Sequence, residues 1–160
     1  MKYPTLLLLG VLLISVSSKL IFTDEFNTFD FKKWKHDISL AGGGNWEFQI
    51  YENNRSTSWV KDSKLNIKPV LTEDKIGMNN VRAGYTYDLW GGTPADQCTM
   101  NSFYGCSRTS DGNHYINPIM SAKVTTTQSF SFKYGRVEVK AKLPKGDWLW
   151  PAIWLLPRNQ

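Results

Sequence analysis

The chain of 160 residues has little of several features that mark other classes of protein. It has only two cysteines and two histidines, and charged residues make up only 21% of it. Two cysteines exclude a small fold built on many disulfides. The low charge, together with 14% aromatic residues, excludes intrinsic disorder. The formal net charge is +5, but the basic residues are scattered along the chain, so we expect no nucleic acid partner.

The longest apolar run lies at the amino terminus. Met1 and Lys2 give a positive start, residues 6–16 are almost wholly apolar, and small residues follow at Ser17 and Ser18. This order is typical of a secretory signal peptide, and the run is shorter than the roughly 20 residues that span a bilayer. We therefore expect residues 1–18 to be a signal peptide and the product to be secreted, without a membrane partner.

Secretion also bears on the two cysteines and on one asparagine. Cys98 and Cys106 enclose seven residues, and an oxidising compartment favours a disulfide between them. A metal site would need further Cys or His ligands nearby, and only His114 is close. The sequence therefore predicts a structural disulfide and no metal. Asn54 begins an Asn-Arg-Ser sequon, which makes it a candidate for N-glycosylation.

The secondary-structure signal is that of β-strands, because no segment after the apolar run shows sustained helical periodicity. In residues 136–143, four apolar residues alternate with four charged ones, which predicts a half-buried strand. Short strands separated by Gly- and Pro-rich turns predict an all-β sandwich or jelly roll. Residues 72–118 contain few strand signals and are expected to form a long loop. The other predicted strands cover residues 46–51, 65–67, 119–127 and 150–156.

No catalytic arrangement is visible among the fourteen carboxylates of the chain. A glycosidase usually needs two carboxylates that flank one bond. On one face of a strand, such a pair would be spaced two residues apart, and this spacing does not occur. Glu47 and Glu52 are five apart, so a regular strand places them on opposite faces. No phosphate-binding loop or paired-histidine motif occurs either, so the residues predict no catalytic group and no cofactor.

The aromatic residues are the stronger indication of a binding site. Trp148, Trp150 and Trp154 lie within seven residues and would share one face of an extended strand. Tryptophan rings can stack on sugar rings, so the three tryptophans could line a sugar-binding groove. Packing in the hydrophobic core explains the same pattern, and the residues by themselves favour core packing over a groove. The polar side chains that could bind sugar hydroxyls beside them are Asn45, Glu47, Gln49 and Asn53.

Three ordered stretches resemble glycoside hydrolase family 16. Residues 44–56 begin Gly-Asn-Trp-Glu-Phe-Gln, residues 88–109 include Leu-Trp-Gly-Gly-Thr-Pro, and residues 130–154 end Trp-Leu-Trp-Pro-Ala-Ile-Trp. Within that family they are most similar to animal laminarinase-like β-1,3-glucanases and to β-1,3-glucan recognition proteins. The resemblance implies a jelly-roll β-sandwich with a glucan cleft on its concave sheet, which agrees with the strand pattern.

The family's catalytic strand has the pattern Glu-x-Asp-x-x-Glu after the tryptophan-rich stretch, and the chain stops at Gln160 before that pattern. The resemblance therefore implies that residues 19–160 are the amino-terminal part of a family 16-like domain, incomplete at its carboxyl end and inactive as written. It also implies a laminarin-like β-1,3-glucan as the partner. Lys123 stands where relatives commonly have an arginine. The residues expected to contact the glucan are Asn45, Glu47, Asn53, Arg55, Lys123, Trp150 and Trp154.

Three functions remain open at this stage. The first is a β-1,3-glucanase, represented by an incomplete chain. The second is a non-catalytic β-1,3-glucan recognition protein of innate immunity. The third is a naturally truncated, lectin-like glucan-binding product. No residue before Gln160 distinguishes the enzyme from the recognition protein.

Overall fold

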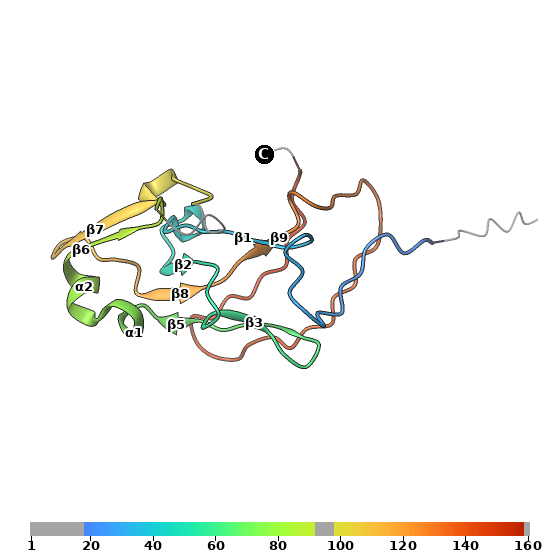
Figure 1. The fold of residues 1–160 in the computed structure, drawn as a ribbon, viewed down its shortest axis with the longest axis horizontal. Helices are drawn as coiled ribbons and strands as arrows, with labels where there is room; N and C mark the ends of the chain where they lie inside the picture. Colours follow the sequence, from blue (N-terminus) through green and yellow to red (C-terminus); the bar gives the residue numbers. More distant parts are fainter. Residues whose placement is uncertain (1–17, 92–97, 159–160) are drawn as a thin grey trace, which may run out of the picture.

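The structure is a computed structural model that describes residues 18–91 and 98–158. The predicted signal peptide therefore lies outside the described residues, except for Ser18. Figure 1 shows short strands connected by long irregular segments. In chain order, the strands, the α-helices and the 3-10 helices (η) are β1 (Lys35–His36), η1 (Gly42–Gly44), β2 (Gln49–Tyr51), β3 (Ser58–Val60), β4 (Leu65–Ile67), β5 (Val70–Leu71), α1 (Glu73–Ile76), α2 (Met78–Arg82), β6 (Ala83–Asp88), η2 (Ser102–Tyr104), β7 (Ser107–Asp111), β8 (Ile119–Ser121) and β9 (Val124–Thr125).

The sheet that positions the candidate site consists of β2, β8 and β5. β2 pairs with β8 in parallel, with Gln49 opposite Ile119 and Tyr51 opposite Ser121. β5 lies antiparallel to β8 on its other side. Because side chains alternate along a strand, the buried Ile50 points into the core while Gln49 and Tyr51 share the other face. The remaining pairs are antiparallel: β1 with β9, β3 with β4, and β6 with β7.

The hydrophobic core lies between the β2–β8 sheet and the β6–β7 hairpin. Ile50 comes from β2, Met120 from β8 and Tyr87 from β6, so the same cluster packs two sheets together. Burying each large apolar side chain stabilises the fold by about 1.5–3 kcal/mol. This arrangement confirms the predicted all-β class and is compatible with a β-sandwich. The core cluster consists of Ile38, Leu40, Ile50, Tyr87, Leu89, Ile116 and Met120.

The prediction of a long loop over residues 72–118 is wrong. This stretch contains α1, α2 and the β6–β7 hairpin, in which Tyr87 pairs with Arg108. The hairpin was missed because its alternation is weak: Tyr87 and Ser110 are buried, but most of their neighbours on both strands are polar and exposed. The Thr86 and Thr109 hydroxyls bond across the two strands at 2.8 Å. Side-chain pairs of this kind stabilise a sheet without an apolar pattern.

The strands predicted over residues 136–143 and 150–156 are also absent. Both segments are irregular and exposed throughout, and they belong to the orange-to-red stretch without arrows in Figure 1. Alternation gives a strand two distinct faces, but a strand also needs a neighbour that accepts its backbone hydrogen bonds. Among the described residues, no strand pairs with either segment. Their side chains, Val137 and Leu143 among them, therefore remain in solvent.

A charged network connects the end of β2 to α1 and β6. The Lys75 ammonium donates to both carboxylate oxygens of Glu52, at 3.0 and 2.9 Å, and to the Tyr87 hydroxyl at 2.6 Å. Tyr87 in turn donates a short hydrogen bond to Glu52. Glu52 is thus buried in a structural network. In the described ranges, no helix is long and apolar enough to cross a membrane.

Candidate functional site

A continuous row of polar side chains occupies the outer face of β2 and the segment before it. The Glu47 carboxylate accepts the Asn45 amide at 3.2 Å and the Gln49 amide at 2.6 Å. Gln49 also donates to the Tyr51 hydroxyl at 2.9 Å. Only Gln49 and Tyr51 belong to β2, and because Trp46 has a positive φ of 59°, hydrogen bonds rather than strand geometry join Asn45 and Glu47 to them. Asn45 is exposed and the other three are half-buried, so the row can be reached from solvent.

Lys123 extends this row from a distant part of the chain. It lies two residues after Ser121, which pairs with Tyr51 in the β2–β8 register, and its ammonium forms an ion pair with Asp37 at 2.6 Å. Both Lys123 and Asp37 act electrostatically on Tyr51. We call Asn45, Glu47, Gln49, Tyr51 and Lys123 the polar row. The structure thus joins the predicted site residues Asn45 and Glu47 by a hydrogen bond and places Lys123 at the Tyr51 end of the row.

The protonation of Tyr51 suits hydrogen bonding to neutral groups. Burial raises the pKa of Tyr51 above its usual value, and the Glu47 carboxylate acts in the same direction. The amide of Gln49 and the charge of Lys123 oppose this rise in pKa. The phenol is therefore neutral at physiological pH and keeps its proton for donation. In the row, Glu47 accepts hydrogen bonds while Lys123 and Tyr51 can donate them.

Asn53 and Arg55, also predicted to contact the ligand, form a separate pair beyond the end of β2. The Arg55 guanidinium donates a short hydrogen bond to Asn53 and lies 5.7 Å from the centre of the Phe29 ring. The neighbouring Asn54 side chain accepts hydrogen bonds from the Ser56 amide and hydroxyl, at 2.8 and 2.9 Å. These bonds form a local turn, which presents the sequon at the surface.

The structure does not bring Trp150 and Trp154 to the polar row. Their side chains are 84% and 68% exposed, and Trp148 is fully exposed. Within residues 18–91 and 98–158, no ring contact involving these tryptophans is found. Core packing of the three tryptophans, the alternative that the residues alone favoured, is therefore wrong for this structure.

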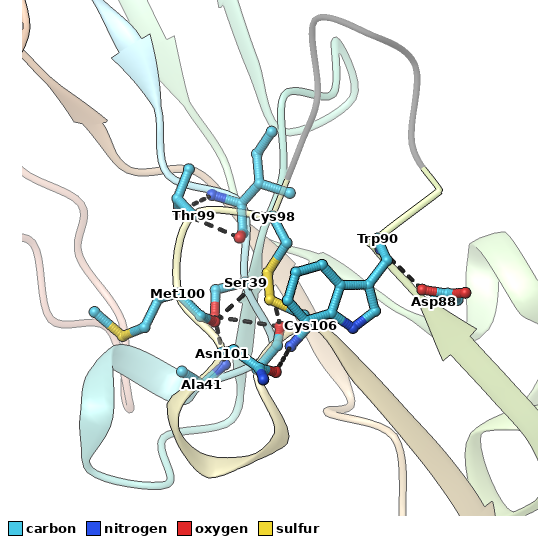
Figure 2. The surroundings of a disulfide bond; sticks show 11 residues. Ser39, Ala41, Asp88, Trp90, Cys98, Thr99, Met100, Asn101 and Cys106 are labelled. Carbon is cyan, nitrogen blue, oxygen red and sulfur yellow. Dashed lines mark hydrogen bonds between the residues drawn. A yellow bond between two sulfur atoms is a disulfide. The ribbon is translucent and has the colours of Figure 1, made fainter.

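The predicted disulfide between Cys98 and Cys106 is present, and its loop supports the segment that leads into the site. Figure 2 shows Ser39 beside this loop. The Ser39 hydroxyl donates to the Met100 carbonyl at 2.7 Å, and the Leu40 amide donates to the Gly105 carbonyl at 2.6 Å. The cross-linked loop therefore holds the backbone a few residues before Asn45.

Sequence reasoning missed Tyr51 and Asp37 as parts of the site. Tyr51 continues the two-residue spacing of Asn45, Glu47 and Gln49, so the alternation itself could have indicated it. Asp37 gave no such signal, because it reaches the row only through the ion pair with Lys123. Across the described part of the chain, no group of three His, Cys, Asp or Glu side chains is placed to hold a metal ion.

The fold and the polar row define an all-β protein with a half-buried strand face that offers both donors and acceptors. Such a face suits a neutral ligand with many hydroxyl groups. Comparison with known proteins bears on the class of that ligand. No family model matches the chain, and no solved structure matches it either.

Curated relatives do match most of the chain. It is 54% identical over 141 residues to a β-1,3-glucan-binding protein of Penaeus monodon, covering 88% of this chain and 38% of that protein. It is 33% identical over 141 residues to a β-1,3-glucan-binding protein of Tenebrio molitor, covering 88% and 28%. It is 35% identical over 150 residues to glucan endo-1,3-beta-glucosidase A1 of Niallia circulans, covering 88% and 17%.

The chain is therefore a homologue of the β-1,3-glucan-binding proteins and of a related β-1,3-glucanase. These relatives are consistent with the resemblance to the β-1,3-glucanases and β-1,3-glucan recognition proteins that the sequence motifs indicate. The chain spans a little over a third of the length of the Penaeus relative and less of the other two.

Proposed function

We propose that this chain is a β-1,3-glucan-binding unit in which the polar row hydrogen-bonds the hydroxyl groups of the glucan. The strongest support is that this row lies in a chain 54% identical to a β-1,3-glucan-binding protein. A glucan is neutral, so its recognition needs donors and acceptors rather than net charge. Within the row, the ion pair with Asp37 balances the charge of Lys123.

Lys123 gives the sharpest test of this proposal, because a matched control exists. Lys123 pairs with Asp37 and Lys33 pairs with Asp24, and the two lysine side chains are similarly exposed. We expect Lys123→Met to weaken binding of the full chain to soluble laminarin by about fivefold or more, as for the loss of a central polar contact. Isothermal titration calorimetry would measure this, and Lys33→Met is expected to bind like the wild type.

A third variant tests the chemistry of the same position. Lys123→Arg introduces the planar fork that binds two oxygens at once, so we expect it to bind laminarin at least as tightly as the wild type. If Lys123→Met and Lys33→Met have equal effects, the polar row is not where the glucan binds. If the wild-type chain binds no laminarin, the proposed glucan-binding function is wrong.

Hydrolysis of the glucan is the second candidate function, favoured by the 35% identity to glucan endo-1,3-beta-glucosidase A1. We expect this chain to release no reducing sugar from laminarin, because no two of its carboxylates have the two-residue spacing that a catalytic pair on one strand face would show. The assay compares purified chain with a buffer control. Sugar release above that control would favour the enzyme.

Four further residues are proposed as secondary glucan contacts. Asn53 and Arg55 lie directly beyond β2, in the direction in which the row continues along the strand. Trp150 and Trp154 expose broad ring faces that suit stacking on sugars. Their alanine variants, measured in the same titration, would show whether any of them contributes.

We further propose that the protein acts outside the cell, as a family 16-like unit over residues 19–160. The signal-peptide pattern of residues 1–18, the disulfide and the sequon at Asn54 support this location. The mass of the natural protein, before and after deglycosylation, tests both modifications. It should show removal of residues 1–18 and one glycan at Asn54.

A further inference from the structure

An aromatic cavity of about 350 Å³ opens beside the segment that bears the polar row. Trp46 and Phe48, which lie between the row residues Asn45, Glu47 and Gln49 in the sequence, both line it. Glu47 belongs to both places, because it also lines the cavity. We call this space the aromatic cavity. Its lining residues are Trp46, Glu47, Phe48, Val81, Arg108, Tyr115, Ile116, Asn117 and Pro118.

One wall of the cavity is held by Arg108. Its guanidinium donates to the Asn117 side chain and, at 2.7 Å, to the Phe103 carbonyl, and it lies 5.3 Å from the centre of the Trp46 ring. The Trp46 and Phe103 rings meet edge to face at 5.3 Å. Trp46 is thus fixed by a cation on one side and by a ring edge on another, and a fixed ring loses little freedom on binding.

Asn117 anchors this wall to the sheet. It is buried, and its amide nitrogen lies 3.3, 3.2 and 3.4 Å from the backbone carbonyls of Leu40, Glu47 and Gln49. The backbone carbonyl of Asn117 accepts a hydrogen bond from the Thr72 hydroxyl at 2.7 Å. The side-chain oxygen of Asn117 accepts a hydrogen bond from the Arg108 guanidinium. The backbone around the polar row, which holds the Asn117 amide, therefore also sets the position of the guanidinium.

The aromatic rings around the cavity remain open to solvent. Trp46, Phe48 and Tyr115 are 56%, 68% and 57% exposed, although each has a large apolar surface. Single exposed aromatics are ordinary, but several around one cavity indicate a ligand site. A volume near 350 Å³ lies at the small end of the range for ligand pockets, which suits one sugar ring rather than a long chain.

We propose that the aromatic cavity is a second saccharide subsite, which takes one neutral pyranose ring of the glucan. The exposed aromatic rings stack on the ring's C–H faces, and Arg108 donates to its hydroxyls. A neutral ligand fits because the cavity is lined by both the cation of Arg108 and the carboxylate-bearing Glu47. This inference rests on the proposed function, since the glucan supplies the ring. A glucan that engages both the polar row and the aromatic cavity must be longer than one bound by the row alone.

The test is calorimetric titration of the full chain with β-1,3-linked glucose oligomers of increasing length. We expect Tyr115→Ala and Phe48→Ala to weaken binding of long oligomers about fivefold and to leave binding of the shortest bound oligomer unchanged. Lys123→Met is expected to weaken binding at every length. Tyr134→Ala replaces a tyrosine that is exposed and outside the cavity lining, and it should behave like the wild type.

The possible outcomes separate the two proposals. If both cavity variants bind every oligomer like the wild type, the aromatic cavity is not a saccharide subsite, and glucan binding by the row still stands. If the cavity variants weaken the binding of short and long oligomers equally, the second subsite is also overturned. The substitutions would then reduce affinity by disturbing the polar row rather than by removing a separate contact with a longer glucan. If the wild-type chain binds no oligomer, both proposals fail. Since Phe48 and Tyr115 are exposed, their variants should fold, and circular dichroism checks this.

Discussion

Lys75→Met is expected to lower the free energy of unfolding by about 2–3 kcal/mol. The substitution leaves the Glu52 carboxylate, whose side chain is only 10% exposed, without its cation. Removing one partner of a buried ion pair typically costs about 3–5 kcal/mol. We expect somewhat less here, because the Lys75 side chain is 42% exposed and the Tyr87 hydroxyl still donates to Glu52. Urea unfolding followed by tryptophan fluorescence measures the change.

A matched control and a double variant make this prediction specific. Lys33→Met removes a lysine from a longer contact, 3.7 Å from an Asp24 carboxylate that keeps two N–H donors, and should therefore cost less than Lys75→Met. Adding Glu52→Gln to Lys75→Met removes the buried charge and should recover part of the lost stability. A Lys75→Met chain as stable as the Lys33→Met chain would show that the network contributes nothing measurable.

The same network gives a pH dependence. Burial raises the pKa of Tyr87 well above its usual value, and the hydrogen bond and the charge of Glu52 raise it further. The folded state therefore favours the neutral phenol. This contribution to stability is complete below about pH 10, where a tyrosine in the unfolded chain ionises, and is lost as the pH rises further. Tyr87→Phe should make the decline in unfolding free energy above pH 10 less steep, and an unchanged decline would contradict this.

The second large effect is expected from the disulfide. Replacing both Cys98 and Cys106 by alanine should lower the free energy of unfolding by about 2.5 kcal/mol in the chain-entropy model for so short a loop. Reducing the wild-type chain should give a similar loss, since both changes release the same loop. Urea unfolding with and without a reductant measures it. A stability that depends on neither change would mean that the hydrogen bonds of the loop hold it without the cross-link.

Loss of the disulfide should also lower the affinity of the binding site for the glucan. The loop accepts hydrogen bonds from Ser39 and Leu40, just before the Asn45 segment, and its Phe103 contacts Trp46. Freeing the loop therefore loosens one wall of the aromatic cavity as well as the approach to the polar row. In the oligomer titration, the Cys98→Ala/Cys106→Ala chain should lose more affinity for long oligomers than for short ones.

Parts of the fold could be predicted from local alternation. The strand expected over residues 65–67 is β4, the one expected over residues 46–51 contains β2, and the one expected over residues 119–127 contains both β8 and β9. In β2 and β8 a buried residue lies between two half-buried ones, which is the alternation that the prediction uses. Alternation was equally clear in residues 136–143, but no neighbouring strand lies there. The alternation of apolar and polar residues indicates which face of a strand could be buried, but it does not show whether a neighbouring strand is present to pair with it.

The sequence by itself determined the all-β class, the disulfide partners and the alternation that puts Gln49 and Tyr51 on one face of β2. These follow from local geometry and from the small number of cysteines. Only the tertiary structure decided that Lys123 completes the polar row and that Arg108 and Tyr115 line the cavity beside Trp46. These residues lie 60 or more positions from their neighbours in the site. Lys123 reaches the row because β8 pairs in parallel with β2, a register that depends on burying Ile50 and Met120 in one core. Arg108 reaches the cavity from β7, where it donates a hydrogen bond to the Asn117 side chain.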